Sequence, residues 1–374
     1  MRSKSILVMI ITVILLATAE QCNAITYEII DLGTLGGDSS IAYSINNNGQ
    51  VVGWARDTSS RTRATLFDPT GRGINIDLGT LGGTGSHGNV AYSINDNGVI
   101  VGSAENSSGF INATLFDETG KGNNTDLGSI GGNGGRAYSI NNNGQIVGES
   151  GNSTGQYHAT LFDPIYNGNN TDLGTLGGDL SWVTSSNDSG QIVGWAEFDA
   201  TGTRHATLFD PTGGSNIDLG TLGGSFSEAL SINDNGIIVG SAENSFSDTD
   251  IACIFDPTGN GDNIELGTLL GFDDSYANSI NNNGQIVGHS QNNVLSLRHA
   301  TWFDPTGNGN NIDLNNLIAP NSGWILMYAH SINDNGWIVG EGYINGESHA
   351  YLLTPEPSTL LLLGLGALML RNRR

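Results

Sequence analysis

The sequence predicts an all-β protein, a seven-bladed β-propeller made of four-stranded blades. Three short motifs recur seven times in the same order, with a period near 47 residues. No helical apolar pattern lies between them. A period of this length without helices is typical of a four-stranded propeller blade. The phase of the repeat further predicts that the N-terminal strand closes the last blade.

The three motifs alternate with variable segments. The first is Asp-Leu-Gly-Thr-Leu-Gly-Gly, the second Ser-Ile-Asn-(Asn/Asp)-Asn-Gly-x-(Ile/Val)-Val-Gly, and the third Ala-Thr-Leu-Phe-Asp-Pro-Thr-Gly. Copies of the first motif begin at Asp31, Asp77, Asp126, Asp172, Asp218, Glu265 and Asp313. Some copies are imperfect, but the spacing stays regular, which indicates one structural unit per copy.

Four strands are expected in each repeat. In the first copy they cover residues 43–45, 50–54, 63–67 and 74–78, with turns at 46–49 and 68–71 and a crossing to the next blade at 79–83. Asn and Gly tolerate the positive φ of the first turn, and Pro suits the second position of the other turn. Short apolar runs without strict alternation fit strands that are packed on both faces.

The two ends of the repeat region are each incomplete. The region opens with a fourth strand, residues 27–31, and closes with a third strand, residues 349–353. In a closed ring the opening strand would pair near Ala350 and complete the seventh blade, which protects an exposed edge. An open β-solenoid, which would gain nothing from this phase, is the alternative architecture.

Residues 1–24 have the features of a cleavable signal peptide. A basic start is followed by an apolar run from Ile6 to Ala17 and by small residues up to Ala24. A membrane anchor is the alternative, but the run is shorter than the roughly 20 apolar residues that span a bilayer. The repeat domain then occupies residues 25–354.

Residues 355–374 form a second sorting signal. Pro355, Glu356 and Pro357 precede an apolar run, residues 360–370, and a basic end. This segment resembles the PEP-CTERM sorting tail of Gram-negative bacteria, which exosortase-type proteases recognise. The resemblance implies an exported protein of the extracellular space or outer envelope, processed by such a protease and in transient membrane contact through the tail.

The third motif carries a second resemblance. Four copies begin with His-Ala, at His158, His205, His299 and His349. With the other motifs, they make residues 27–353 similar to the HAF-repeat family of extracellular bacterial proteins. That resemblance implies secretion and a repeat architecture, with no established activity.

The charge composition of the repeat domain limits the kinds of partner that it can bind. Between the two signals there are 8 basic and 35 acidic side chains, so the net charge is −27 with His neutral. Such a surface repels phosphate backbones and disfavours nucleic-acid binding. Only Cys253 remains after signal removal, and it is expected to be a buried small residue without a disulfide framework.

Three residue patterns contain side chains that could bind a metal ion. The Ser-x-Asn-x-Asn-Gly turn starts like a calcium loop but lacks its bidentate Glu, so a hairpin turn is favoured. The recurring Asp of Asp-Pro-Thr-Gly is interpreted as a cap of its own turn. The four His residues lie too far apart in a ring to share zinc, so each should fill a blade edge or touch a ligand alone. No cofactor is expected, although a calcium-stabilised structural module remains open.

No catalytic constellation is evident, so the variable loops between the second and third strands are the candidate site. Basic and aromatic residues in or near these loops are the candidate ligand-binding residues: Arg61, Arg63, Tyr157, Arg204 and Arg298. The leading hypothesis is a non-enzymatic protein that binds polysaccharide or another surface component. The alternative is a secreted propeller hydrolase or lyase with a carboxylate or His site at the ring mouth.

Overall fold

The computed structural model describes residues 26–85, 88–163, 168–245 and 249–356. These parts of the chain are all-β, as predicted, except for a short 3-10 helix at Leu314–Leu317. Five sheets contain four antiparallel strands each, and a sixth sheet contains eight strands. The predicted signal peptide, residues 1–24, lies outside the described residues, as does the sorting tail from Pro357 onward.

The strands of each four-stranded unit follow one another along the chain, in the order that the motifs predict. The first strands are β2 (Gly36–Ile45), β6 (Val90–Ile94), β10 (Gly131–Ile140), β14 (Ser181–Ser186), β18 (Gly223–Ile232), β22 (Asp274–Ile280) and β26 (Trp324–Ile332). The second strands are β3 (Val51–Asp57), β7 (Ile100–Glu105), β11 (Ile146–Asn152), β15 (Ile192–Glu197), β19 (Ile238–Asn244), β23 (Ile286–Asn292) and β27 (Ile338–Ile344).

The third and fourth strands form the outer part of each unit. The third strands are β4 (Thr62–Phe67), β8 (Ile111–Phe116), β12 (Tyr157–Phe162), β16 (Arg204–Phe209), β20 (Asp250–Phe255), β24 (Leu297–Phe303) and β28 (Glu347–Pro355). The fourth strands are β5 (Ile76–Asp77), β9 (Thr125–Asp126), β13 (Thr171–Asp172), β17 (Ile217–Asp218), β21 (Ile264–Glu265) and β25 (Ile312–Asp313), together with β1 (Tyr27–Asp31) at the start of the chain.

The opening strand β1 completes the unit formed by β26, β27 and β28. It pairs antiparallel with β28, from Tyr27 opposite Pro355 to Asp31 opposite Tyr351. The predicted pairing near Ala350 is therefore confirmed. The eight-stranded sheet is this unit joined to the β2–β5 unit through one parallel residue pair, Ser39 with Ser348.

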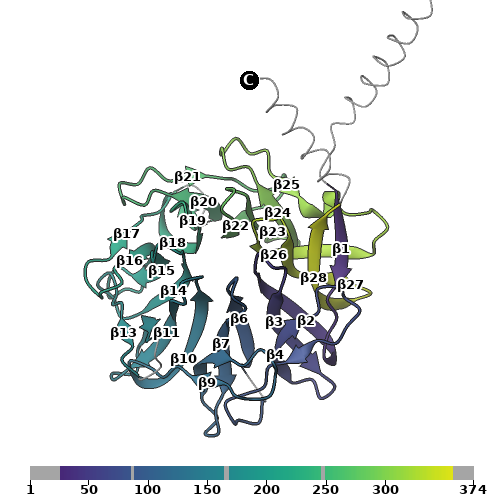
Figure 1. Cartoon of the computed structure of the whole chain (residues 1–374). Coiled ribbons are helices and arrows are strands. Elements are labelled where there is room, and N and C mark those ends of the chain that lie inside the picture. The colour runs from purple at the N-terminus through teal and green to yellow at the C-terminus, as the bar shows by residue number, and fades with distance from the viewer. Residues whose placement is uncertain (1–25, 86–87, 164–167, 246–248, 357–374) are drawn as a thin grey trace, which may run out of the picture.

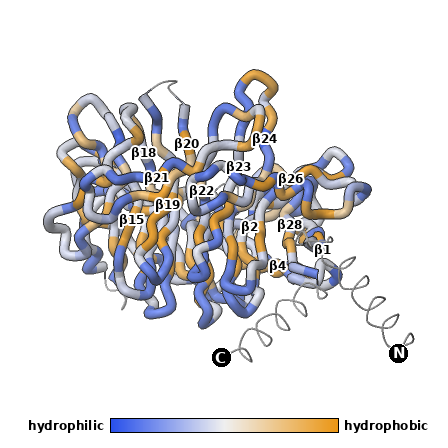
Figure 2. The backbone as a smooth tube through the Cα atoms, turned by 90° about the horizontal axis from the view of Figure 1, so that it is seen from above, coloured by the Kyte–Doolittle hydropathy of each residue, from blue (hydrophilic) through white to orange (hydrophobic). Residues whose placement is uncertain are grey.

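The units are arranged around a common centre (Figure 1). Each first strand contacts the first strand of the next unit, from β2 through β6, β10, β14, β18 and β22 to β26, and β26 contacts β2 in turn. Figure 2 shows the strands between two layers of turns, with hydrophilic turns along the lower edge. The purple β1 lies beside the yellow β28, so the two ends of the described domain meet (Figure 1).

The apolar core lies between neighbouring units. One cluster joins Val52 and Ala64 of the β2–β5 unit to Ala91, Ile100 and Phe116 of the next. Each of the first six third strands ends in Phe, and these rings are at most 5% exposed. Burying a Phe side chain contributes about 1.5–3 kcal/mol, so the repeated Phe stabilises six of the contacts between units.

A bulge in every first strand explains the Gly at the last position of the second motif, which is Gly53 in the first copy. The β2–β3 register shifts between Ala42 and Ser44, which leaves Tyr43 unpaired, and the other units repeat this shift. The bulged backbone approaches Gly53 so closely that an added Cβ would lie 2.0 Å from the Ile41 carbonyl oxygen. Only Gly fits there, and the bulge turns one side chain per unit away from the ladder.

Two strand boundaries differ from the prediction. The first strand of the first complete unit begins at Gly36, inside the expected crossing, because Gly36 pairs with Asp57 at the end of β3. The fourth strand of this unit, β5, has two residues where five were expected. Asn75 replaces ladder bonds there: its Oδ1 accepts from the Asp68 N–H and its Nδ2 donates to the Leu32 carbonyl.

Candidate functional site

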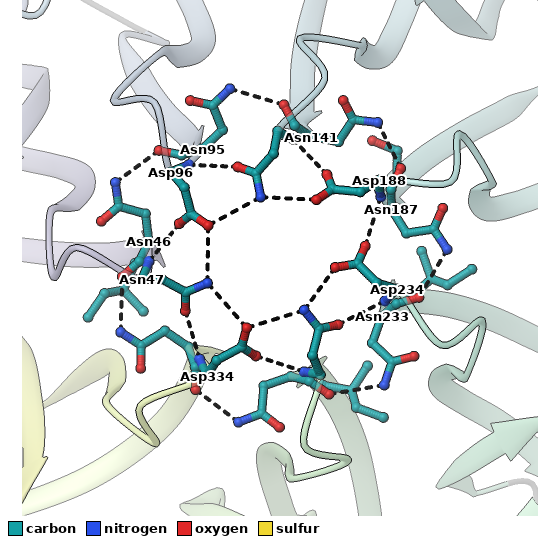
Figure 3. Close-up of a pocket in the computed structure, with 18 of the residues that line it drawn as sticks. Asn46, Asn47, Asn95, Asp96, Asn141, Asn187, Asp188, Asn233, Asp234 and Asp334 are labelled. Carbon is teal, nitrogen blue, oxygen red and sulfur yellow. Dashed lines mark hydrogen bonds between the residues drawn. The ribbon is translucent and has the colours of Figure 1, made fainter.

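The Asn-rich turns meet at one end of the central axis, where they form a closed hydrogen-bonded circle (Figure 3). We call it the Asn/Asp ring; its members are Asn47, Asp96, Asn142, Asp188, Asp234, Asn282 and Asp334. In each step a backbone N–H donates to the side-chain Oδ1 of the next member at 2.8–2.9 Å. The hairpin-turn interpretation is confirmed, but these turns also link neighbouring units, which was not predicted.

The side chains of the Asn/Asp ring alternate donors and acceptors almost completely. The amide of Asn142 donates to the carboxylates of Asp96 and Asp188, at 3.2 and 3.1 Å. Seven positions cannot alternate throughout, so the neighbours Asp188 and Asp234 face each other without an amide between them. In the described parts of the chain, no group of three or more His, Cys, Asp or Glu side chains could hold a metal ion.

The bulged residues line another part of the axis, within the first strands. In chain order these are Tyr43, Tyr92, Tyr138, Thr184, Leu230, Asn278 and His330. With Trp182 they surround a hollow of about 230 Å³, which we call the axial hollow. The bulge therefore places one variable side chain per unit in a shared chamber.

Aromatic and imidazole rings form an open series of contacts around this part of the axis, to which every unit except β18–β21 contributes. We call them the aromatic mouth; in order of contact they are Trp195, Trp182, Tyr138, Tyr92, Tyr43, His330, Tyr328, His289 and Tyr276. Successive ring centroids lie 4.6–6.1 Å apart. Rings at this separation stabilise one another and form a rigid apolar surface with polar edges.

A second hollow, of about 210 Å³, opens between the β10–β13 and β14–β17 units. We call it the rim hollow. Its lining residues are Arg136, Glu149, Tyr157, Leu180, Ser181, Trp182 and Trp195. Glu149 is 1% exposed, and its Oε1 accepts from Arg136 at 2.6 Å and from the Tyr138 hydroxyl at 3.2 Å. Burial raises the pKa of the Glu149 carboxyl, and Arg136 counteracts that rise.

Other charged groups surround the mouth. The Arg204 guanidinium lies 4.9 Å above the Trp195 ring and 3.2 Å from the Glu228 carboxylate. Arg298 lies 5.5 Å from the centre of the Tyr328 ring. Burial raises the pKa of Glu341 to about 7.

Burial has the opposite effect on the two imidazoles of the mouth. It lowers the pKa of His330 to about 4 and that of His289 to about 3. Burial disfavours the charged form of an imidazole, so both His side chains are neutral at pH 7.

The four His residues of the His-Ala starts have a different role. Their Nδ1 atoms pair with the Asp at the start of the first motif: His158 with Asp172, His205 with Asp218, His299 with Asp313 and His349 with Asp31, at 2.7–3.0 Å. Three of these Asp side chains also accept the N–H of a crossing Gly. The His residues therefore fix the outer edge of these four units.

The Asp at the start of the turn after the third strand behaves as predicted in the five copies whose turn is described. The Asp68 carboxylate accepts from the Thr70 N–H at 3.2 Å and from the Thr70 hydroxyl at 2.6 Å. These bonds lower the pKa of Asp68. The buried state of Cys253 is also confirmed, since its side chain is fully buried and unpaired with any other Cys.

The sequence-predicted ligand-binding residues divide into two groups. Tyr157 lines the rim hollow, and Arg204 and Arg298 lie over rings of the aromatic mouth. Arg61 and Arg63 both bind the Asp57 carboxylate, at 2.8 and 3.1 Å, outside both hollows.

Sequence reasoning missed Arg136, Glu149, Trp182 and His330. One signal was available: the residue before Ser in the second motif varies from copy to copy, while its neighbours are almost fixed. The bulge places that residue in the axial hollow.

Comparison with known proteins finds two matches. Residues 215–354 match the model of a protein family of unknown function, DUF3466. Residues 353–374 match the PEP-CTERM protein-sorting motif. No curated protein matches the chain. Within the described residues, no helix has the length and apolar character needed to cross a bilayer. The C-terminal motif, which includes Pro355, Glu356 and Pro357, makes this chain an exported protein that is sorted by exosortase.

Proposed function

We propose that this chain is a seven-bladed β-propeller that binds polysaccharide at its aromatic mouth, without catalysis, in the extracellular space or outer envelope of a Gram-negative bacterium. The circuit of first strands and the pairing of β1 with β28 support the propeller. The repeat motifs, which resemble those of the HAF-repeat family, support the same architecture and the same extracellular location.

The aromatic mouth is the observation that carries this function. Sugar rings present flat C–H faces that pack on aromatic rings, and hydroxyls that bind carboxylates, guanidinium groups and imidazoles. The mouth combines both kinds of contact, because Trp182 and Trp195 lie beside Arg136 and Glu149. Apolar concave surfaces with a few converging polar groups are typical of binding sites for small ligands or chain segments.

A glycan array and a pull-down with purified bacterial exopolysaccharide test the proposal. The native protein should bind, and Trp182→Ala should lose at least nine-tenths of the signal, because Trp182 lines both hollows. Arg61→Ala is the matched control, since Arg61 lies outside them. Absence of binding to every glycan, or equal binding by Trp182→Ala, would refute the function.

One observation favours a second candidate, a polysaccharide hydrolase or lyase. Glu341 is largely buried at the mouth, and its pKa of about 7 suits a general acid near neutral pH. A panel of polysaccharides tests it by release of reducing ends or unsaturated sugars. Turnover that Glu341→Gln abolishes would support an enzyme, whereas binding without turnover supports the non-enzymatic function.

A further inference from the structure

The two hollows of the aromatic mouth are adjacent. Trp182 lines both of them, and it stacks on Tyr138 of the axial hollow and on Trp195 of the rim hollow. Each hollow measures 210–230 Å³, which is below the roughly 300–1,000 Å³ typical of drug-sized ligand sites. Each is therefore sized for one small ring, and the pair for two consecutive rings of a chain.

The rim hollow contains a buried oxygen that lacks a partner. Glu149 Oε2 is fully buried and accepts no hydrogen bond from any described residue, although Oε1 accepts two. An unpaired buried carboxylate oxygen costs free energy, because no hydrogen bond offsets its loss of hydration. A ligand hydroxyl that displaces the atoms covering Oε2 would remove that cost.

Arg136 supplies the complementary donors. Its side chain is 37% exposed, and only Nη1 is used in the 2.6 Å contact with Glu149. A guanidinium has five N–H donors in a fixed plane, so others can reach a ligand. One hydroxyl can then donate to Glu149 while its neighbour on the ring accepts from Arg136.

The net charge of the Arg136–Glu149 pair favours one class of ligand over others. Arg136 and Glu149 together are neutral, so the rim hollow attracts neither anions nor cations. A uronic acid would meet the strongly acidic domain, which has a net charge of −27. The ammonium of an amino sugar would meet Arg136. An uncharged sugar avoids both penalties.

The axial hollow contains a second unpartnered atom. His330 Nε2 is buried and has no hydrogen-bond partner among the described residues. Neutral imidazole has one donor nitrogen and one acceptor nitrogen, so it can bind a hydroxyl in either role. Tyr43, Tyr92 and Tyr138 supply apolar faces around it.

We propose that the rim hollow and the axial hollow are adjoining subsites for two consecutive residues of an uncharged glycan, with Arg136 and Glu149 binding neighbouring hydroxyls of one ring and His330 binding the other. This inference rests on the proposed function, because it specifies the ligand class of the same mouth.

Isothermal titration calorimetry on the full-length exported protein tests the subsites. The probes are cellotetraose and mannotetraose as uncharged glycans, tetramannuronate as the anion, and a chitosan tetramer as the cation. At least one uncharged probe should bind at least tenfold more tightly than both charged probes. Glu149→Gln, which keeps the side-chain shape, should weaken that binding at least tenfold, and Arg136→Lys should do the same.

Asp38→Asn is the matched control, because Asp38 and Arg56 form an exposed ion pair, at 3.2 Å, outside both hollows. Its affinity should equal that of the native protein, and thermal unfolding should confirm that every variant is folded. Unchanged affinity in Glu149→Gln, or equal or tighter binding of tetramannuronate, would overturn the subsites while leaving the proposed function standing if Trp182→Ala still abolishes binding. No binding of any probe or polysaccharide would overturn both.

Discussion

Tyr27 should be the strongest single determinant of the junction between the two ends of the domain. Its ring is 3% exposed and packs in a cluster with Leu326, Tyr351 and residues of the preceding unit. Its hydroxyl donates to the Gly336 carbonyl at 3.1 Å. Replacing a buried aromatic side chain by Ala costs about 3–5 kcal/mol. Tyr27→Ala should therefore weaken the β1–β28 pairing by about 4 kcal/mol.

Hydrogen exchange measures this effect locally. A loss of about 4 kcal/mol corresponds to about a thousandfold increase in the opening equilibrium, since 1.4 kcal/mol is tenfold. The amides of β28 that pair with β1 should exchange faster by about that factor, while amides of β16 remain unchanged. Ile74→Ala is the control, because Ile74 is 90% exposed and its change should stay within about 0.5 kcal/mol. An increase below tenfold in β28 would refute the reasoning.

Three further predictions concern the outer edge, the Asn/Asp ring and the bulge. The Asp31–His349 pair lowers the pKa of Asp31 and raises that of His349. Its stabilisation should be greatest between the unfolded pKa values, about pH 4 to 6.5. It should fall at lower pH as Asp31 protonates and at higher pH as His349 deprotonates. Urea midpoints measured across pH should show this maximum, and His349→Gln should flatten it. Asp188→Asn removes the like charge beside Asp234 but also the acceptor of the 3.1 Å bond from Asn142, so its stability relative to the native protein should be higher at low salt than at 1 M salt; a difference that does not depend on salt would contradict the electrostatic cause. Gly288→Ala should cost more than about 3 kcal/mol in urea unfolding, because its Cβ would lie 1.9 Å from a carbonyl oxygen; a loss below 1 kcal/mol would show that the bulge yields.

The repeat motifs were sufficient to predict the strand order and the pairing of β1 with β28. Each motif copy specifies the same turns, because Asn, Gly, Asp and Pro act through local backbone geometry. The repeat region begins with a lone fourth strand and ends with a unit that lacks its fourth strand. Pairing these two segments completes one four-stranded unit. The prediction failed at the fourth strand, where the Asn75 side chain takes over bonds that a longer backbone ladder would make.

The site was less predictable, because its contacts join residues of different units. Asn47 and Asp96 are 49 positions apart, and no local pattern reveals that they bind each other. The basic residues of the variable loops were predicted to bind a ligand. However, Arg61 and Arg63 form ion pairs with Asp57 within the same unit. The bulge leaves two traces in the second motif: the Gly at its end and the variable residue before its Ser.

The pairing of β1 with β28 has a mechanical consequence. The Glu356 N–H donates to the Thr26 carbonyl at 3.0 Å, so the ladder of β1 reaches the first residues of the sorting motif. β28 lies between β1 and β27, and both neighbours run antiparallel to it. If the protein is tethered through its C-terminal side, a pull loads β28 along its length, in shear. Many hydrogen bonds then share the force at once instead of breaking one after another, and the anchored end is the part of the domain best suited to resist it.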